Sequence, residues 1–128
     1  MTAAANIIEQ LLPLARPIDE LQPDPANART HGVKNLEAIK ASLTRYGQRK
    51  PIVVRAADMI VEAGNGTLEA AKALGWARIA AVVVDDDPTT ATGYAIADNR
   101  TAELAEWDDD ALSKLLESVA EEIPLDSL

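Results

Sequence analysis

The chain has 128 residues, which is enough for one domain with a hydrophobic core and leaves little room for a second. It contains no cysteine, which excludes disulfide bonds, thiolate metal sites and thiol catalysis. The net charge of −9 argues against DNA binding by the molecule as a whole. No apolar run approaches the ~18 residues of a membrane span, and the N-terminus lacks the basic start and cleavage site of a signal peptide, so we expect a soluble cytoplasmic protein.

The charge is distributed unevenly along the chain. Residues 1–64 hold eight Lys and Arg against seven Asp and Glu, whereas residues 65–128 hold four against fourteen. Within the first half, residues 29–55 carry seven basic residues and one acid, Glu37. Two interpretations of this basic stretch stay open: it faces phosphates, or it is a solvated helix face that balances the acidic half.

The first third of the sequence predicts an edge strand, a loop and a helix. The segment 12–18 is apolar but contains two prolines, which suits an edge strand. Residues 22–30 include two more prolines and an asparagine, which is typical of an ordered loop. Apolar side chains recur at helical spacing between residues 33 and 46, and Gly47 ends this expected helix.

The middle of the chain predicts a hairpin, a helix and a buried strand. Short strands at residues 51–54 and 59–62 are separated by a polar turn, as in a hairpin. A helix follows at residues 68–74. The segment 79–84 is the most apolar strand, and its continuous run of Val and Ala predicts burial on both faces.

Two helices are expected in the last part of the chain. Asp87 and Pro88 suit an N-cap and a first helical position, and this helix runs to about residue 105. Asp108 caps the last helix, onto which Trp107 is expected to pack as a hydrophobic staple. The apolar face of that helix consists of Leu112, Leu115, Leu116 and Val119.

This irregular alternation of strands and helices predicts an α+β fold, a small mixed sheet packed with helices. We assign residues 12–122 to the folded domain. Residues 1–11 form an N-terminal segment, and residues 123–128 form a frayed C-terminal tail.

The first candidate site is the stretch Gly64-Asn65-Gly66-Thr67, which lies between an expected strand and an expected helix. The first amides of a helix have no internal partners, and the helix dipole adds positive charge there. Glycine lets a phosphate approach the backbone, so this stretch indicates a phosphate site. Asn-Gly is also a common tight-turn dipeptide, but a hairpin would require a strand rather than a helix next.

The second candidate site is Asp98-Asn99-Arg100, three polar residues inside an otherwise apolar helical stretch. Asp98 could hold Mg²⁺, Asn99 could ligate the ion or a phosphate oxygen, and Arg100 could pair with a phosphate. The alternative is an internal ion-pair network at a helix bend.

Other polar residues are weaker candidates. His31 is the only histidine, so neither a histidine-based metal site nor a Ser-His-Asp triad is expected. The acidic runs 85–87 and 108–110 resemble metal ligands, but each lies at an expected helix start. Capping and the helix dipole explain them more simply.

Four segments together resemble the ParB N-terminal domain, the ParB/sulfiredoxin-like fold, over about residues 12–120. They are PIDELQPDPANART, YGQRKPIVVR, VEAGNGTLEAAKALGW and YAIADNRTAEL. The resemblance is greatest to the stand-alone ParB-like proteins of phages and mobile elements, often called ParB-like nucleases. It implies binding of CTP with Mg²⁺ and slow hydrolysis, as in the chromosome-partition members, or binding of ATP, as in sulfiredoxins and a free-serine kinase.

The resemblance also implies roles for individual residues. Gly64, Asn65, Gly66 and Thr67 stand where the family's motif holds the triphosphate. Asp98 and Asn99 stand where a Glu-Asn pair holds metal and phosphate. Three further positions near the phosphates or the base are Asn27, Arg29 and Gln48.

The chain departs from the family in three respects. Gly66 and Thr67 replace a pair of arginines, so at least one charged phosphate contact is missing. The sulfiredoxin cysteine is absent, which excludes that activity. No helix-turn-helix or dimerisation segment follows the fold, so we expect no sequence-specific DNA binding and a monomer or a weak homodimer.

Three functional hypotheses follow. The first is a nucleoside-triphosphate-binding domain, using CTP or ATP with Mg²⁺, with slow or vestigial hydrolysis in a DNA-related process of a phage or mobile element. The second is a metal-dependent nuclease, although no cluster of three acids is visible near the motifs. The third is a non-catalytic adaptor for a protein partner in DNA modification or packaging.

Overall fold

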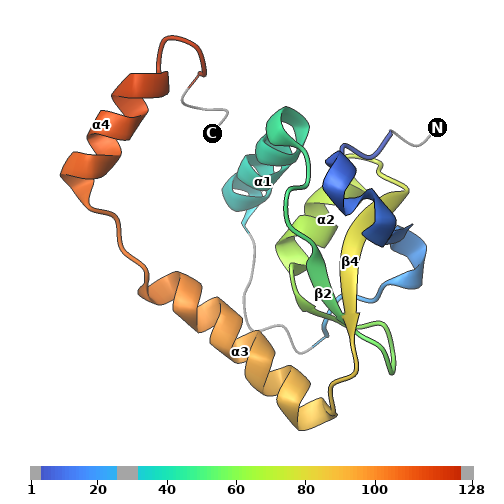
Figure 1. Cartoon of the computed structure of the whole chain (residues 1–128). Coiled ribbons are helices and arrows are strands. Elements are labelled where there is room, and N and C mark those ends of the chain that lie inside the picture. Colours follow the sequence, from blue (N-terminus) through green and yellow to red (C-terminus); the bar gives the residue numbers. More distant parts are fainter. Residues whose placement is uncertain (1–3, 26–31, 125–128) are drawn as a thin grey trace.

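A four-stranded mixed sheet with the strand order β1-β4-β2-β3 forms the centre of the structure (Figure 1). This computed structural model describes residues 4–25 and 32–124. The central strand β4 pairs antiparallel with β1 and parallel with β2, and β2 pairs antiparallel with β3. The expected α+β class with a mixed sheet is confirmed. The strands are β1 (Ala15–Pro17), β2 (Ile52–Arg55), β3 (Val61–Ala63) and β4 (Arg78–Val84).

Helices precede the sheet, connect some of its strands and continue the chain after its last strand. They are the short 3₁₀ helices η1 (Glu9–Leu14) and η2 (Ile18–Glu20), followed by α1 (Val33–Tyr46), α2 (Asn65–Ala73), α3 (Pro88–Leu104) and α4 (Asp109–Val119). Across the two described ranges, no helix combines the length and apolar character that crossing a membrane requires.

The hydrophobic core joins the sheet to α1 and α2, which pack against each other. Ala70 and Ala71 of α2 are fully buried, and their small side chains allow close packing. This matches the alanine-rich, phenylalanine-free composition. The largest fully buried side chains are Leu68, Ile79, Val54 and Val61.

The N-terminal edge of the sheet is shorter than the sequence predicts. The expected strand at residues 12–18 begins as η1, which contains Pro13, and only Ala15–Pro17 pair with β4. Proline lacks the amide that a ladder needs, and here Pro13 lies in η1 outside the strand while Pro17 is the last residue of β1. The edge position of this strand is confirmed.

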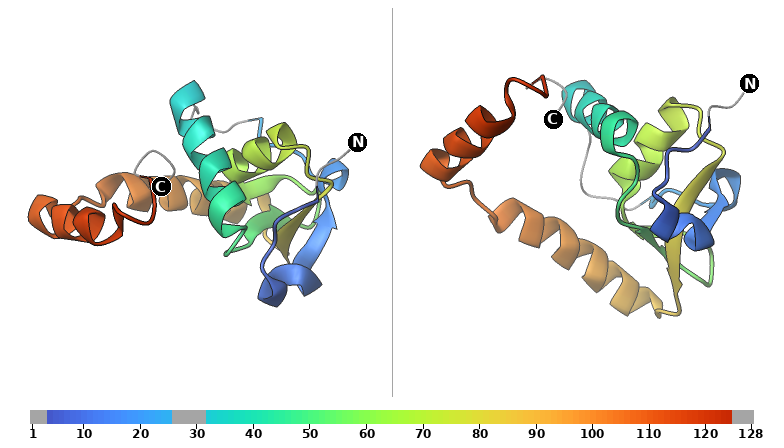
Figure 2. Two further views of the ribbon diagram at one scale, coloured as in Figure 1. Left: turned by 90° about the horizontal axis from the view of Figure 1, so that it is seen from above. Right: turned by 45° about the horizontal axis from the view of Figure 1, so that its top comes forward.

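The last two helices form an arm, residues 88–119, that extends away from the sheet (Figures 1 and 2). The expected caps are confirmed, since the side chains of Asp87 and Asp108 accept bonds from the amides of Thr90 and Ala111. However, α4 has no buried residue, and Trp107 is 74% exposed. The amphipathic pattern of α4 was predicted, but the rest of the described structure buries none of its residues.

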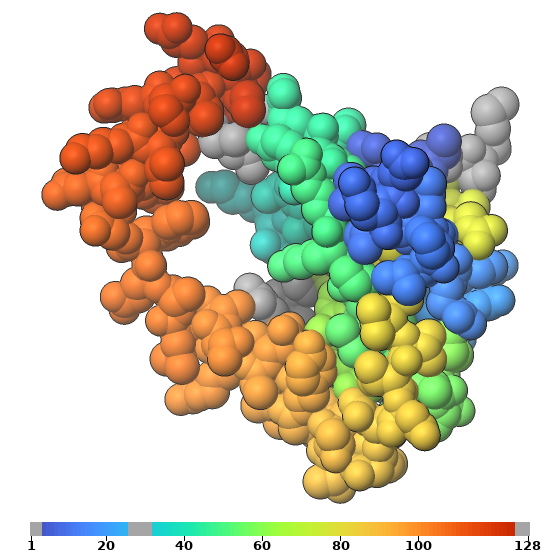
Figure 3. Space-filling view, in the orientation of Figure 1, coloured from blue at the N-terminus to red at the C-terminus, as the bar shows by residue number. Residues whose placement is uncertain are grey.

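The exposure of β4 corrects a second expectation. The run of Val and Ala predicted burial on both faces, yet Val82 and Val83 are each more than one third exposed. Among the described strands, β1 pairs only with residues 78–80 of β4, so no strand lies beside Val82 and Val83 on that edge. In the space-filling view, the arm is separated from α1 by an opening (Figure 3).

Candidate functional site

The chain turns sharply at Gly64, between β3 and α2. Gly64 is the N-cap of α2 and has a left-handed φ of 102°. A Cβ at this position would lie 2.4 Å from Cγ2 of Ile52, so the turn requires glycine. Asn65, Gly66 and Thr67 therefore form the first turn of α2, as the phosphate hypothesis needs.

The first turn of α2 presents backbone amides that have no acceptor inside the helix. The first bond of the helix runs from the amide of Leu68 to the carbonyl of Gly64, at 2.9 Å. The amides of the three residues between them precede that bond and have no acceptor within the helix. Together with the helix dipole, they favour a bound anion.

Both polar atoms of the Asn65 side chain are engaged in hydrogen bonds within the fold. Its Nδ2 donates to the Val61 carbonyl at 3.1 Å, and its Oδ1 accepts the amide of Asp24 at 3.0 Å. Asn65 thus fixes the segment before residue 26 to the N-terminus of α2. Asn27, Arg29 and His31 lie outside the described residues.

One face of α3 carries the second predicted motif. Tyr94, Asp98, Thr101 and Ala102 are spaced by three or four residues, so they share one side of the helix. The Thr101 hydroxyl donates to the backbone carbonyl of Asp98 at 3.0 Å. All four residues, with the adjacent Asn99, line a single pocket.

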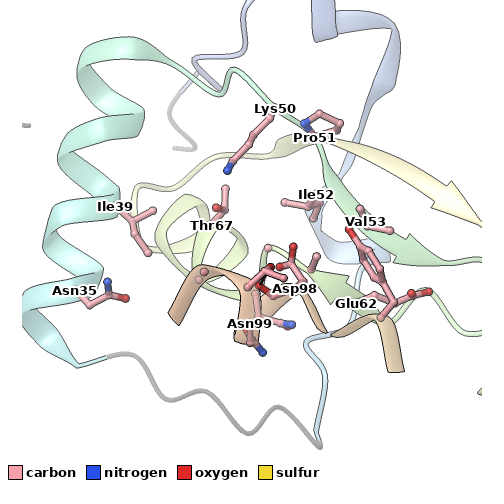
Figure 4. Close-up of a pocket in the computed structure, with 17 residues that line it drawn as sticks. Asn35, Ile39, Lys50, Pro51, Ile52, Val53, Glu62, Thr67, Asp98 and Asn99 are labelled. Carbon is pink, nitrogen blue, oxygen red and sulfur yellow. Dashed lines mark hydrogen bonds between the residues drawn. The ribbon is translucent and has the colours of Figure 1, made fainter. Parts of the chain in front are cut away.

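This pocket, with a volume of about 580 Å³, brings the two predicted motifs together. The Gly64–Thr67 turn forms one part of its wall and the Asp98–Asn99 segment another. In the close-up, Thr67 and Lys50 lie on one side, and Asp98 and Asn99 lie on the other (Figure 4). Residues far apart in the sequence therefore meet in a space that suits a small polar ligand.

The structure does not bring Gln48 or Arg100 to this pocket. The Gln48 side chain is buried and pairs with both backbone groups of Ala80: its Nε2 donates at 2.9 Å, and its Oε1 accepts at 2.8 Å. These two bonds hold the Gln48 side chain against the backbone of β4. Arg100 is exposed and is absent from the pocket lining, because it lies two positions from Asp98 and so points from another side of α3.

Lys50 and Glu62 are pocket residues that the sequence patterns did not single out as site residues. Lys50 is the only cation among the described lining residues, and its side chain points toward Thr67 (Figure 4). It directly precedes the proline that opens β2, but one lysine in a basic stretch gives no specific signal. Glu62 belongs to β3 and is 5% exposed.

The electrostatics of the pocket follow from these residues. Burial raises the pKa of Glu62 to about 7, the Asp86 carboxyl adds to this effect, and Arg55 opposes it. With Asp98, the lining holds two carboxyl groups and one ammonium group. A polyphosphate would bind to this lining favourably only together with a cation, because the cation would offset the negative charge of the phosphates and the carboxylates.

The residues present fit a magnesium ion that also binds phosphates. Among the described residues, no group of three Asp, Glu or His side chains could hold a metal by itself. Mg²⁺ usually takes one or two carboxylates and completes its shell with water and substrate phosphates. Asp98 and Asn99 supply oxygen atoms of this type at the pocket wall.

Comparison with known proteins gives the family. The chain matches the ParB N-terminal domain over residues 4–99. It is 30% identical over 76 residues to the ParB-like nuclease domain-containing protein YnaK of Escherichia coli K12, covering 59% of this chain and 86% of that protein.

Solved structures agree with this match. The C-terminally truncated chromosome-partitioning protein ParB from Caulobacter crescentus, complexed with CTP-γ-S, superposes with a TM-score of 0.70 at 27% identity, covering 85% of this chain. The same protein complexed to the centromeric parS site gives 0.58 at 26% identity, covering 88%. This chain spans only 64% and 61% of those two chains. Sulfiredoxin from Arabidopsis thaliana, at 17% identity over 62% of this chain and 92% of that one, shares the fold with a TM-score of 0.53. On the extent of the family match, the chain belongs to the ParB N-terminal domain family.

Proposed function

We propose that this domain binds a nucleoside triphosphate with Mg²⁺, and that CTP is the first candidate. The observation that carries the proposal is the shared pocket of the Gly64–Thr67 turn and the Asp98–Asn99 segment. The helix N-terminus offers backbone donors for phosphate oxygens, and the α3 face offers oxygen ligands for the ion. The Caulobacter ParB structure with CTP-γ-S supports CTP over other bases.

The lining predicts weak binding. Thr67 offers one neutral hydroxyl, and Lys50 offers the one ammonium group among the described lining residues. A charge-assisted hydrogen bond contributes about 1.5–3 kcal/mol, against about 1 kcal/mol for a neutral one. We therefore expect a Kd no better than tens of micromolar, since a deficit of 1–2 kcal/mol weakens binding roughly five- to thirtyfold.

The chemistry we propose is slow or vestigial hydrolysis. When bound, Mg²⁺ would offset the charge of the phosphates. Asp98 and Asn99 would hold it from α3, and the first turn of α2 would fix the phosphate chain. Positioning of the phosphates and compensation of their charge are the main contributions that proteins make to phosphoryl transfer.

Calorimetry tests the proposal directly. CTP, ATP and GTP are titrated into the protein with MgCl₂ and again with EDTA. We expect a heat of binding with CTP and MgCl₂, and we expect it to disappear when EDTA replaces MgCl₂. Asn99→Ala should weaken binding, whereas Thr92→Ala, an exposed position on α3 outside the pocket, should not. No binding of any triphosphate at millimolar concentration would contradict the proposal.

A nuclease is the second candidate, because the matched Escherichia coli protein is named for a ParB-like nuclease domain. The described residues contain no three-residue cluster for a metal-dependent nuclease. Incubation with supercoiled plasmid and Mg²⁺ separates the two: conversion to nicked circles, abolished by Asp98→Asn, would favour the nuclease. Duplex binding, if any, should be salt-sensitive and independent of sequence.

A further inference from the structure

Glu62 is a buried acid for which the proposed nucleotide site gives no role. It lies in a β-bulge of β3. The strand advances two residues, from Val61 to Ala63, where β2 advances one. Glu62 is the extra residue, and neither of its carboxylate oxygens has a hydrogen-bond partner. Bulges often direct a side chain beside a functional site, and an unpartnered buried carboxylate is costly.

Charged and titratable groups approach Glu62 from four elements. They are Arg55 of β2, Asp58 of the following turn, Asp86 of the connection between β4 and α3, and, across the shared pocket, Tyr94 and Asp98 of α3. Arg55 is already held by Asp58 in a two-bonded ion pair. It therefore offsets only part of the charge of Glu62, and the pKa of Glu62 stays raised, at about 7.

A proton fits between Glu62 and Asp86 better than a metal ion does. Two ionised carboxylates are both acceptors, so neither can donate to the other. One proton converts one of them to a donor and allows an O–H···O⁻ bond, which is short and strong. A metal would need further ligands, and the described residues hold no group of three acidic or histidine side chains placed to bind one.

The position of Asp86 links this carboxyl pair, Glu62 and Asp86, to the nucleotide pocket. Asp86 lies in the three-residue connection from β4 to α3, and α3 packs against β3. The same helix carries Tyr94 and Asp98 to the pocket wall. A bond between Glu62 and Asp86 therefore joins the base of α3 to the strand that leads into the phosphate-binding turn.

We propose that Glu62 is a positioning residue, which shares a proton with Asp86 and thereby holds α3 against β3 with Asp98 at the pocket. When the proton is lost, two like charges face each other, and the base of α3 loosens. The carboxyl pair itself is independent of any ligand. Only its effect on nucleotide binding rests on the proposed function.

Hydrogen exchange of the protein without nucleotide tests the pair. Protection factors of α3 amides, corrected for intrinsic exchange, are measured at pH 6 and pH 8. With the pKa of Glu62 at about 7 in the closed state and near 4.5 in an opened one, protection should fall about tenfold between these two values. Unchanged protection would overturn the proposal.

Three variants separate positioning from simple packing. Glu62→Gln keeps the shape and donates permanently to Asp86, so it should keep at pH 8 the protection that the native protein has at pH 6. Glu62→Ala should lose protection at both pH values. Asp85→Asn, an exposed acid in the same connection, should behave as the native protein does. A pH response in Glu62→Gln equal to the native one would refute the role of Glu62.

Two measurements keep the test decisive if a variant does not fold. The carboxyl ¹³C shift of Glu62 in the native protein should titrate near pH 7, and a midpoint near 4.5 would overturn the proposal. CTP titrations at pH 6 and pH 8 then separate the two proposals. Exchange that responds to pH without nucleotide binding would contradict only the nucleotide function, whereas binding with pH-independent exchange would contradict only the carboxyl pair.

Discussion

Replacing Gly64 by alanine tests the turn on which the proposed phosphate site depends. Two costs add in this variant. Alanine in the left-handed region costs about 1–2 kcal/mol. The new Cβ would also lie 2.4 Å from Cγ2 and 2.8 Å from Cβ of Ile52, a buried core residue that cannot move freely.

The sum predicts a strong loss of stability. Overpacking in a core costs about 1–3 kcal/mol, so we expect Gly64→Ala to lower the free energy of unfolding by about 2–5 kcal/mol. A domain of this size has about 5–15 kcal/mol in total. Urea denaturation followed by circular dichroism measures the change. Gly93→Ala, where nothing lies within 4 Å and the helix favours alanine, should raise stability by up to about 1 kcal/mol.

A double-mutant cycle with Ile52→Ala measures the Cγ2 part of the clash, because that variant removes Cγ2 but keeps the Cβ at 2.8 Å. Ile52→Ala alone should cost about 2–5 kcal/mol. The double variant should be more stable than additivity predicts, by part of the overpacking cost of about 1–3 kcal/mol, since the contact with Cβ of residue 52 remains. If Gly64→Ala costs less than about 1 kcal/mol, or if the two changes are additive, the argument that this turn requires glycine is wrong.

Three further predictions concern the pocket. Thr67→Arg should tighten triphosphate binding roughly five- to thirtyfold by calorimetry, because a guanidinium donates charged bonds to phosphate; no change would indicate that phosphates do not reach this turn. Asn99→Ala should lower triphosphate affinity while its melting temperature stays within a few degrees of the native value; a large loss of stability at constant affinity would assign Asn99 to folding. The pKa of Glu62 is raised in the folded state, to about 7 from 4.5, so the folded protein binds more protons than the unfolded chain between about pH 4.5 and pH 7. The free energy of unfolding should therefore fall as the pH rises through this range, by at most about 3 kcal/mol. Glu62→Gln should remove this slope in urea titrations, and an identical slope in the variant would contradict the assignment.

Local patterns predicted the elements well where a residue marks each boundary. The helix expected at residues 33–46 is observed with those bounds, because apolar spacing fixes its face and Gly47, with a φ of 77°, ends it. The same holds at Asp87 and Asp108, whose side chains accept the capping bonds. The sharp turn at Gly64 was predicted for a similar reason, since a glycine between an apolar strand and a helical sequence marks the residue at which the chain reverses.

Features that depend on distant contacts could not be predicted in this way. The pairing of Gln48 with Ala80 requires knowledge of which strand lies beside it, and a polar residue after a glycine gives no such signal. The bulge at Glu62 depends on the register of β3 with β2. The hydrophobic pattern of α4 predicts an apolar face but not what, if anything, packs on it. The orientation of Arg100 was accessible from helical geometry alone, because residues two apart do not share a face.

The manner in which the arm is attached has a mechanical consequence. A helix rises 1.5 Å per residue, so Asp98 lies about 15 Å along α3 from Pro88. A rotation of about 10° at the three residues that join β4 to α3 would move Asp98 by about 2–3 Å, more than the ~2 Å length of a bond between Mg²⁺ and oxygen. The connection therefore acts as a hinge for α3, and Asp98, a proposed ligand of the ion, lies partway along that helix. The angular stiffness of these three residues sets how far Asp98 can move relative to the Gly64–Thr67 wall of the pocket.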